Sequence, residues 1–422
     1  MKIKTKVMDY EKVISLPKEK KHRPLKTMMF FRILLVILCF FDLVITKFKI
    51  RKVNMEKLGK KEPCLYLMNH SAFMDMKIAY CVLFPKAFNI IASVDAFVGK
   101  SLLMRLIGCV PARKFIADTQ LVRDMVYCLK NLKTSVLMFP EAGYSFDGTS
   151  TTLPDSLGKC LKLLKVPVVM IKTQGVFLRD PLYNRLQIRR VKTSATMEYI
   201  LSPEDIDRYS VDELNDIISK HFHFDNFRYQ QKNNVVINEP FRADGLNRVL
   251  YKCPHCLSEG EMTGEGTTLK CQACGKEYEL TELGFIKAIS GETEFSHIPD
   301  WYRWERECVK KEVLDGTYNL DIDVNIGVIV NAKCFYMVGE GRLTHSIDGF
   351  RLTGCNGKLD YFQKPLAAYS INSDFFWYEI NDVITVGNSK IFYFCFPKNC
   401  GDVVTKARLA QEEIYKLLKS DR

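Results

Sequence analysis

The chain has 422 residues, of which 47% are hydrophobic and 26% charged, so it is long enough for two or three domains with real cores. Residues 1–61 hold 17 Lys/Arg and 5 Asp/Glu, an excess of +12 that equals the formal net charge of the whole chain. The remainder is balanced, which excludes a protein that is polycationic throughout. The basic N-terminal segment suggests an anionic surface, either lipid headgroups or nucleic acid.

The first 27 residues are polar and basic and show no cleavable signal pattern. Of the 15 cysteines, four form two CxxC pairs and the others are scattered singly, mostly inside apolar runs. This usage differs from the disulfide framework of a small secreted protein. It predicts a reducing, cytosolic compartment in which most thiols are free and buried.

Residues 28–46, MMFFRILLVILCFFDLVIT, are the membrane candidate of this sequence. A helix of this length reaches about 28 Å, close to the thickness of a hydrocarbon core. Arg32 and Asp42 lie within about a turn of its ends, where their charges could snorkel. Because Lys and Arg flank both ends, we expect a monotopic or re-entrant anchor on the cytoplasmic face of a membrane. A single-pass span and a buried helix of a soluble domain are the alternatives.

Residues 50–246 are predicted to form an α/β domain, in which short apolar runs alternate with longer runs of helical period. The predicted strands are 64–68, 88–93, 135–139, 166–172 and a longer, more exposed one at 186–201. The predicted helices are 75–84, 97–108, 119–133, 153–165 and 210–222, the last opening with a Ser210–Glu213 capping box. This alternation predicts a mixed sheet flanked by helices.

Three chemically active side chains follow two of these strands. His70 comes just after strand 64–68 and Asp75 enters the next helix, while Glu141 follows strand 135–139. Reacting groups collect at the carboxyl edge of an open α/β sheet, so we expect the three to lie together. A His–Asp pair is the simplest general-base unit, because the carboxylate fixes the tautomer while the free nitrogen takes a proton. No Ser or Cys nucleophile is evident beside it, so the activated hydroxyl is expected to belong to a substrate.

Blander interpretations exist for each residue alone. His70 could be a buried histidine bound to a backbone carbonyl, and Glu141 a carboxylate favoured by a helix dipole. Arg113, discussed below, could be an ordinary surface residue.

Four sequence blocks resemble the glycerolipid acyltransferases, the family that includes lysophosphatidic acid acyltransferase. NHSAFMD (69–75) matches the family's N-H-x4-D block, and FPEAGYS (139–145) stands where the family has F-P-E-G-T-R-S. IGCVPARK (107–114) resembles the intervening block, and VPVVMIKTQG (166–175) resembles the fourth. All four come in the family's order, covering roughly residues 55–200.

The resemblance implies a role for each residue. His70 would deprotonate an acceptor hydroxyl that attacks an acyl thioester, carried by CoA or acyl-carrier protein, and Asp75 would orient His70. Arg113 would bind a phosphate of the acceptor. The remaining residues expected to hold the acceptor are Glu141, Ala142, Gly143 and Tyr144.

The third block departs from the family pattern, because Gly-Thr-Arg is replaced by Ala142-Gly143-Tyr144. A Tyr hydroxyl can hydrogen-bond but cannot supply charge to a phosphate. The sequence therefore leaves open two acceptors, a (lyso)phospholipid hydroxyl such as that of 1-acyl-glycerol-3-phosphate, and a non-phosphorylated lipid or amine. A catalytically silent lipid-binding scaffold is a third possibility, against which the intact His70–Asp75 pair argues.

Residues 247–285 contain two CxxC pairs separated by fourteen residues, a spacing that suits a zinc ribbon. Four thiolates would close a tetrahedral Zn²⁺ site with no open position, so its role would be structural. His255, inside the first pair, is not expected to be a ligand. The region has no dense basic cluster, which argues for a protein partner and against nucleic acid. The predicted ligands are Cys253, Cys256, Cys271 and Cys274.

Residues 300–422 are predicted to be mainly β. In NLDIDVNI (319–326) apolar residues alternate with Asn and Asp, and five more short strand segments follow between Gly, Asn and Asp turns. The chain closes with an amphipathic helix over 402–419. This order resembles a pleckstrin-homology-like (PH-like) domain in architecture, without a motif. Residues 1–49 would then form a basic arm and membrane-associated helix.

Overall fold

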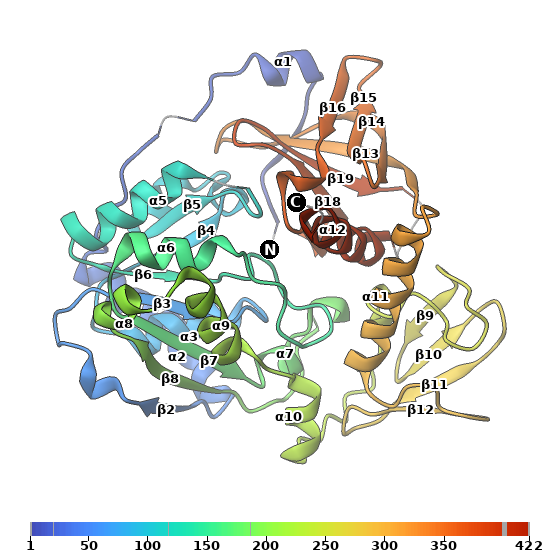
Figure 1. Ribbon diagram of the computed structural model, residues 1–422, viewed down its shortest axis with the longest axis horizontal. Coiled ribbons are helices and arrows are strands. Elements are labelled where there is room, and N and C mark those ends of the chain that lie inside the picture. The colour runs from blue at the N-terminus through green and yellow to red at the C-terminus, as the bar shows by residue number, and fades with distance from the viewer. Residues whose placement is uncertain (1, 20, 117, 186, 399–402, 421–422) are drawn as a thin grey trace.

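The computed structural model describes residues 2–19, 21–116, 118–185, 187–398 and 403–420. Its strands form three sheets of seven, four and eight strands. In Figure 1 the seven-stranded sheet and its helices lie on one side of the molecule, and the other two sheets lie on the opposite side. Helices α11 (Ile298–Leu314) and α12 (Val403–Ser420) run between these parts.

The seven-stranded sheet has the order β2-β8-β7-β3-β6-β4-β5. Strands β7, β3, β6, β4 and β5 are parallel, while β8 is antiparallel to β7 and parallel to β2, so the sheet is mixed as predicted. The bounds are β2 Lys49–Val53, β3 Leu65–Met68, β4 Phe88–Ser93, β5 Cys109–Ala112, β6 Ser135–Met138, β7 Val168–Gln174 and β8 Ser194–Leu201.

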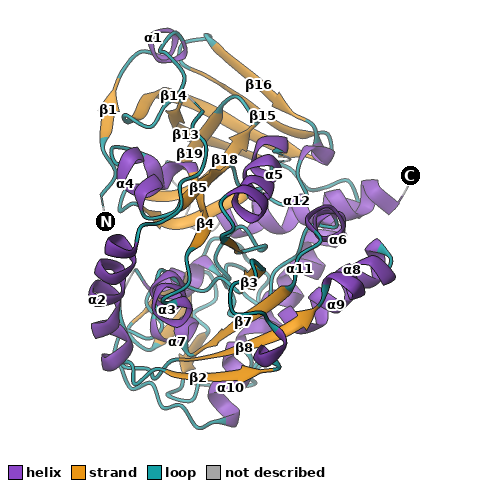
Figure 2. Ribbon diagram, turned by 90° about the vertical axis from the view of Figure 1, so that its left-hand side faces the viewer, coloured by secondary structure: helices purple, strands orange, loops and turns teal. Residues whose placement is uncertain are grey.

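Helices cover both faces of this sheet. In β3, Tyr66 and Met68 belong to one core cluster, whereas Leu65 and Leu67 belong to the other. Successive strand side chains point to opposite faces, so a run as apolar as LYLM is buried on both. Helices α2 and α3 contribute to the first cluster and α5, α6 and α9 to the second. In Figure 2, α2 and α3 lie to the left of strands β3, β7 and β8, and α6 and α9 lie to their right. The helix bounds are α2 Met29–Ile45, α3 Met74–Leu83, α4 Ser101–Leu106, α5 Thr119–Val126, α6 Ser156–Leu164, α7 Val176–Arg179, α8 Pro203–Arg208, α9 Val211–Phe222 and α10 Asn226–Lys232.

The predicted strands 64–68, 88–93, 135–139 and 166–172 are confirmed as β3, β4, β6 and β7. The strand predicted over 186–201 begins only at Ser194, and residue 186 lies outside the described residues. The capping box of α9 is confirmed by reciprocal hydrogen bonds between Ser210 and Glu213. The sequence did not predict β2 and β5. The three basic residues of β2 and Pro111 of β5 interrupt the apolar pattern of a strand, and such residues are common in edge strands.

The N-terminal residues cross to the C-terminal sheet. Strand β1 (Thr5–Val7) pairs in parallel with β14 (Phe335–Ser346), and α1 (Tyr10–Ile14) follows it. The hydroxyls of Tyr10 and Tyr393 lie 3.0 Å apart. The segment expected as a basic arm therefore contributes a strand to a folded unit, and its short polar sequence carries no strand signal.

Helix α2 coincides with the membrane candidate and packs on α3. Among the described residues, none of the helices combines the length and the apolar character that crossing a bilayer requires. The two charges of α2 do not snorkel. Asp42 pairs with Lys77 of α3 at 2.5 Å, and Arg32 donates to the carbonyl oxygen of Pro85, so both face the protein.

The four-stranded sheet is antiparallel, in the order β12-β11-β10-β9. The first CxxC pair precedes β9, and the second begins at Cys271, the last residue of β10, and lies before β11. Its strands are β9 Met262–Glu265, β10 Thr268–Cys271, β11 Glu277–Leu280 and β12 Ile286–Ala288. Helix α11 follows and is absent from the predicted set. It joins this sheet to the last one, since Trp301 donates to the carbonyl of Lys252 and Val313 packs in the shared core.

The C-terminal sheet has the order β16-β15-β14-β13-β19-β18-β17 and carries α12, which gives the mainly β region expected. Ala407, Ala410 and Ile414 of α12 are buried as predicted, and residue 402 lies outside the described residues. The PH-like resemblance stays a prediction. The strands are β13 Leu320–Ile329, β14 as above, β15 Gly349–Gly354, β16 Leu359–Gln363, β17 Asn372–Trp377, β18 Asn381–Gly387 and β19 Phe392–Pro397.

One hydrophobic cluster runs through the four-stranded sheet, α11, the C-terminal sheet and α12, and continues into the seven-stranded unit. Phe146, in the loop after β6, and Phe177 of α7 belong to it together with Trp301 and Ala407. The four-stranded sheet, the C-terminal sheet and part of the seven-stranded unit thus share one hydrophobic core, although the sequence suggests separate domains.

Candidate active site

His70 lies at the carboxyl edge of the seven-stranded sheet, two residues beyond the end of β3. Strand β6 is the parallel neighbour of β3, with Leu65 opposite Val136, so the loop after β6 reaches the same edge. Asp75 sits in the first turn of α3. The expected meeting of His70, Asp75 and Glu141 at one edge is what the structure shows.

Asp75 is fully buried and faces the imidazole, with 3.4 Å between its Oδ2 and Nδ1 of His70. That separation is longer than a normal hydrogen bond, as is common in catalytic pairs before substrate binds. Oδ2 accepts from the backbone N–H groups of Ser71 (2.6 Å) and Ala72 (3.0 Å). Oδ1 accepts from the Thr173 hydroxyl at 2.9 Å. The carboxylate is thus fixed in place, and among the described residues the other ring nitrogen, Nε2, makes no hydrogen bond.

Two aromatic rings enclose the imidazole. The ring centres of Phe139 and Tyr144 lie 4.0 Å and 4.3 Å from that of His70, the first nearly parallel to it. The side chain of His70 is 17% exposed. Burial lowers the pKa of His70, Asp75 opposes this, and the charge of Lys114 lowers it further. The ring is therefore a neutral base at physiological pH.

Glu141 holds the backbone of His70. It is fully buried, its Oε2 accepts from the N–H of His70 at 2.8 Å, and its Oε1 accepts from the N–H of Thr151 at 3.0 Å. Burial raises its pKa to about 7, against these two hydrogen bonds and the charge of Arg408. The expected contact with an acceptor would require one of these bonds to be given up, so the geometry suits a supporting role for Glu141.

The turn after Glu141 is tight. Ala142 adopts a left-handed backbone with φ of 56°, where the resembled family has glycine. An L-residue there costs about 1–2 kcal/mol, which is a form of strain typical of functional loops. The turn sends Gly143 toward Phe115 and returns Ser145 to His70, whose carbonyl accepts from the Ser145 N–H at 3.1 Å.

The charges around Tyr144 are mixed. Arg113 directly follows β5, is half-buried, and makes no ion pair with the described part of the chain. Burial and the carboxylates of Asp374, in β17 of the C-terminal sheet, and of Asp75 raise the pKa of Tyr144. Burial raises the pKa of Asp374 itself to about 7, against the charge of Lys114. Acidic groups and the cation Lys114, which also acts on His70, therefore border the site, whereas no hydrogen bond or ion pair joins Arg113 to Tyr144 or His70 among the described residues.

Some residues of this site were not singled out from the sequence. Asn69 and Thr173 lock the ends of β3 and β7 together, with Thr173 N donating to Asn69 Oδ1 at 2.7 Å. Both stand inside matched blocks, which is the signal that could have found them. Lys114 stands inside a block as well, whereas Asp374 and Arg408 come from the C-terminal region and carry no motif.

The four cysteines after β8 form a second candidate site. Their Sγ atoms all lie within 4.8 Å of one another, with Cys253–Cys274 at 3.8 Å and Cys256–Cys271 at 3.7 Å. Four sulfurs about 2.3 Å from a tetrahedral ion would be about 3.8 Å apart, so the cluster could bind a metal such as zinc. The Nδ1 of His255 lies 3.3 Å from a carboxylate oxygen of Glu294.

Residues 49–173 match the protein-family model described as Acyltransferase. A comparison with curated proteins finds no match. Among solved structures, the chain is similar to the crystal structure of the 1-acyl-sn-glycerophosphate (LPA) acyltransferase PlsC from Thermotoga maritima, at 16% identity and a TM-score of 0.35, over 45% of this chain and 79% of that one. The matched residues include His70, Asp75, Glu141 and Thr173. The family match supports an acyltransferase.

Proposed function

We propose that the protein is a membrane-associated acyltransferase that transfers an acyl chain from an acyl thioester, acyl-CoA or acyl-ACP, to the hydroxyl of a (lyso)phospholipid such as 1-acyl-glycerol-3-phosphate. The observation that carries this proposal is the geometry of His70 at the sheet edge, which has a buried, hydrogen-bonded carboxylate facing Nδ1 and, among the described residues, no hydrogen bond at Nε2. Such a pair argues against a catalytically silent scaffold, which has no need to keep it.

The proposed reaction is a direct transfer. Nε2 of His70 accepts the proton of the acceptor hydroxyl as its oxygen attacks the thioester carbonyl, and Asp75 stabilises the imidazolium. When the C–S bond breaks, the imidazolium returns the proton to the leaving thiolate. The lowered pKa of His70 keeps the base form available at neutral pH.

The function can be tested with purified protein, a labelled acyl thioester and a panel of lipid acceptors, with mass spectrometry of the products. An acylated lysophospholipid formed in a His70-dependent manner supports the proposal. A product from an amine or from an uncharged lipid alcohol alone would replace it with the second candidate below.

Acyl transfer to a non-phosphorylated lipid or amine is the second candidate, and Tyr144 with Asp374 favours it. A phosphate placed beside these groups would lack the second cation of the family pattern and would meet a carboxyl group instead. Arg113 and Lys114 are the cations that favour a phosphate.

The Tyr144→Arg variant should raise activity on lysophosphatidic acid relative to a neutral acceptor. A charge-assisted bond to phosphate contributes about 1.5–3 kcal/mol, so the ratio of kcat/KM values should shift about tenfold to a hundredfold. Arg113→Ala should shift the ratio in the opposite direction. The measurement is kcat/KM for both acceptors, and Tyr144→Phe serves as the size-matched control. An unchanged ratio in Tyr144→Arg would remove Tyr144 as the specificity element.

Membrane association is proposed through α2. Because Arg32 and Asp42 face the protein, the outer side of the helix is wholly apolar. Phe73, at the start of α3 and three residues from His70, is 50% exposed and extends apolar surface toward the site. An in-plane helix of this kind binds through buried apolar area, aided by nearby basic residues. The exposed residues of α2 are Met29, Phe30, Ile33, Leu34, Ile37, Leu38, Phe40, Phe41, Val44 and Ile45.

Changing Ile37, Leu38 and Phe41 together to Ser should lower binding to anionic vesicles by about a hundredfold or more. The reason is that burying each of these side chains in the membrane would contribute about 1.5–3 kcal/mol to the binding free energy. Vesicle sedimentation measures this. Leu257→Ser and Ile289→Ser, which change equally exposed side chains in the four-cysteine region, are the controls. Equal loss in both sets, or none in the α2 variant, would contradict the assignment.

A further inference from the structure

Helix α12, at the end of the chain, reaches the loop that carries Glu141. Arg408 of α12 is 4% exposed, and its Nη1 donates to the carbonyl oxygen of Tyr144 at 3.3 Å. Its guanidinium also lies 4.5 Å from the centre of the Phe146 ring. A single side chain from the C-terminal unit thus contacts two residues of the loop after β6.

That loop, residues 141–151, fixes the backbone of His70 from both sides. Glu141 accepts from the N–H of His70, and the N–H of Ser145 donates to its carbonyl oxygen. Between them, the ring of Tyr144 lies against the imidazole. Because Arg408 binds the Tyr144 carbonyl, a change in Arg408 acts on the residue that separates these two bonds.

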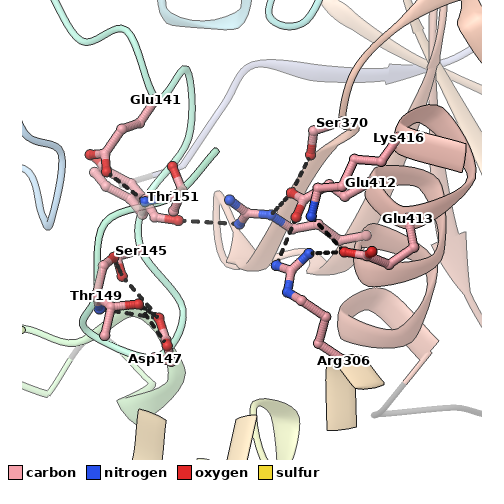
Figure 3. A network of polar contacts seen from close by, with 12 residues as sticks. Glu141, Ser145, Asp147, Thr149, Thr151, Arg306, Ser370, Glu412, Glu413 and Lys416 are labelled. Carbon is pink, nitrogen blue, oxygen red and sulfur yellow. Dashed lines mark hydrogen bonds and ion pairs between the residues drawn. The ribbon is translucent and has the colours of Figure 1, made fainter. Parts of the chain in front are cut away.

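Arg408 is itself held by buried charges. Glu412 Oε1 lies 3.4 Å from its Nε, and Glu412 also accepts from Ser370 at 2.7 Å and pairs with Arg306 of α11 at 2.8 Å. Burial would raise the pKa of Glu412, but Arg306 and Arg408 lower it to about 2. Figure 3 shows this charged group opposite the loop side chains Glu141, Ser145, Asp147, Thr149 and Thr151. The carboxylate stays ionised, so the anchor persists across the physiological pH range.

The loop is also inserted into the C-terminal core. Phe146 is 2% exposed and its ring stacks on Phe375 of β17, with 4.4 Å between the ring centres. It shares a hydrophobic cluster with Ala407 and Ala410, which flank Arg408 along α12. Apolar packing sets the position of the loop, and the directional bond from Arg408 sets its orientation.

We propose that Arg408 is a positioning residue for His70: it holds loop 141–151 in the conformation in which Glu141 and Ser145 bind the His70 backbone. The inference rests on the proposed function for its catalytic meaning. It makes the C-terminal unit a support for the site on the seven-stranded sheet.

The test compares Arg408→Met with Lys406→Met in the full-length protein. Lys406 stands on the same helix and pairs with Glu259 (2.6 Å) and Glu312 (2.8 Å), so its loss removes ion pairs of α12 without touching Tyr144. Arg408→Met should lower kcat on the order of 10²-fold with little change in KM, because a misoriented base affects chemistry more than binding. Hydrogen exchange in peptides covering 70–72 and 141–151 should be about tenfold faster or more, since each depends on the anchored loop.

Lys406→Met should keep both kcat and the slow exchange. If Arg408→Met fails to fold, the double variant Arg408→Met/Glu412→Gln takes its place in the test. It removes one buried charge of each sign and leaves Arg306 paired with Glu413 at 2.9 Å. Equal effects of the Arg408 and Lys406 variants, or unchanged exchange in loop 141–151, would overturn the inference. If the wild type shows no His70-dependent transfer, the proposed function fails, while the exchange comparison still decides whether Arg408 holds the loop.

Discussion

His70→Ala should lower acyl transfer by about a hundredfold or more while the protein still folds, because general-base help contributes about 10²–10⁴-fold in rate. His70 makes no side-chain hydrogen bond among the described residues, so the substitution removes its packing against Phe139 and Tyr144 but breaks no hydrogen bond of the fold. The measurement is initial rate with the best acceptor, alongside thermal unfolding. The loss should be in kcat, since the imidazole acts on the reacting hydroxyl.

The chain offers a matched control. His221 of α9 lies 3.4 Å from Glu198 through its Nδ1, the same separation as in the His70–Asp75 pair, but on another part of the domain. His221→Ala should keep full activity. A His70→Ala protein that retains a tenth of wild-type turnover, or a His221→Ala protein that loses as much, would remove the general-base assignment.

Asp75→Asn should lose a large part of the activity for two separable reasons. The amide removes the charge that stabilises the imidazolium, and its NH2 group cannot accept from the N–H groups of Ser71 and Ala72. The second effect also costs stability, because Asp75 is fully buried. Thr173→Val removes one hydrogen bond to Asp75 and keeps the charge. It should therefore retain more activity than Asp75→Asn. An equal loss in the two variants would show that the charge of Asp75 does not contribute and that its orientation accounts for the whole effect.

The sheet edge could be predicted because its signals are local. Apolar runs such as Leu65–Met68 fix the strands, and parallel pairing then brings the residues after β3 and β6 together, whichever helices follow. The pairing of His70 with Asp75 needs only one turn of chain between them. These short-range relations are visible in the sequence and are what the structure shows.

The support of the site could not be predicted because it depends on contacts of long sequence separation. Arg408 lies 264 residues from Tyr144, and its neighbours give no hint that it faces a loop of another unit. The pairing of β1 with β14 spans a similar distance with only three residues of strand. The backbone contacts of Glu141 could not be predicted either, because its burial and the two N–H groups that bind its oxygens depend on how the loops after β3 and β6 pack together.

The protein is expected to hold about one Zn²⁺ per chain and to lose the fold of its C-terminal part when the metal is removed. Structural zinc contributes about 10–16 kcal/mol in small metal-folded peptides, as much as the whole stability of an ordinary domain. Chelation, or Cys271→Ser, should therefore lower the midpoint of thermal unfolding strongly. Cys395→Ser, which changes an equally buried thiol of β19 outside the cluster, is the control and should cost far less.

Metal loss should also lower activity at the His70 site, through a series of contacts that links the four cysteines to Arg408. Cys253 and Cys271 are fully buried in the same cluster as Trp301 of α11, whose ring packs on Tyr278 with 5.1 Å between the ring centres. One turn on, Arg306 pairs with Glu412, the partner of Arg408. Chelated protein should thus lose kcat and the slow exchange of loop 141–151 together, although no thiolate touches the reaction. Elemental analysis of fresh, reduced protein that finds no zinc would contradict this prediction, and chelated protein with full activity would show that the four-cysteine site does not act on the loop.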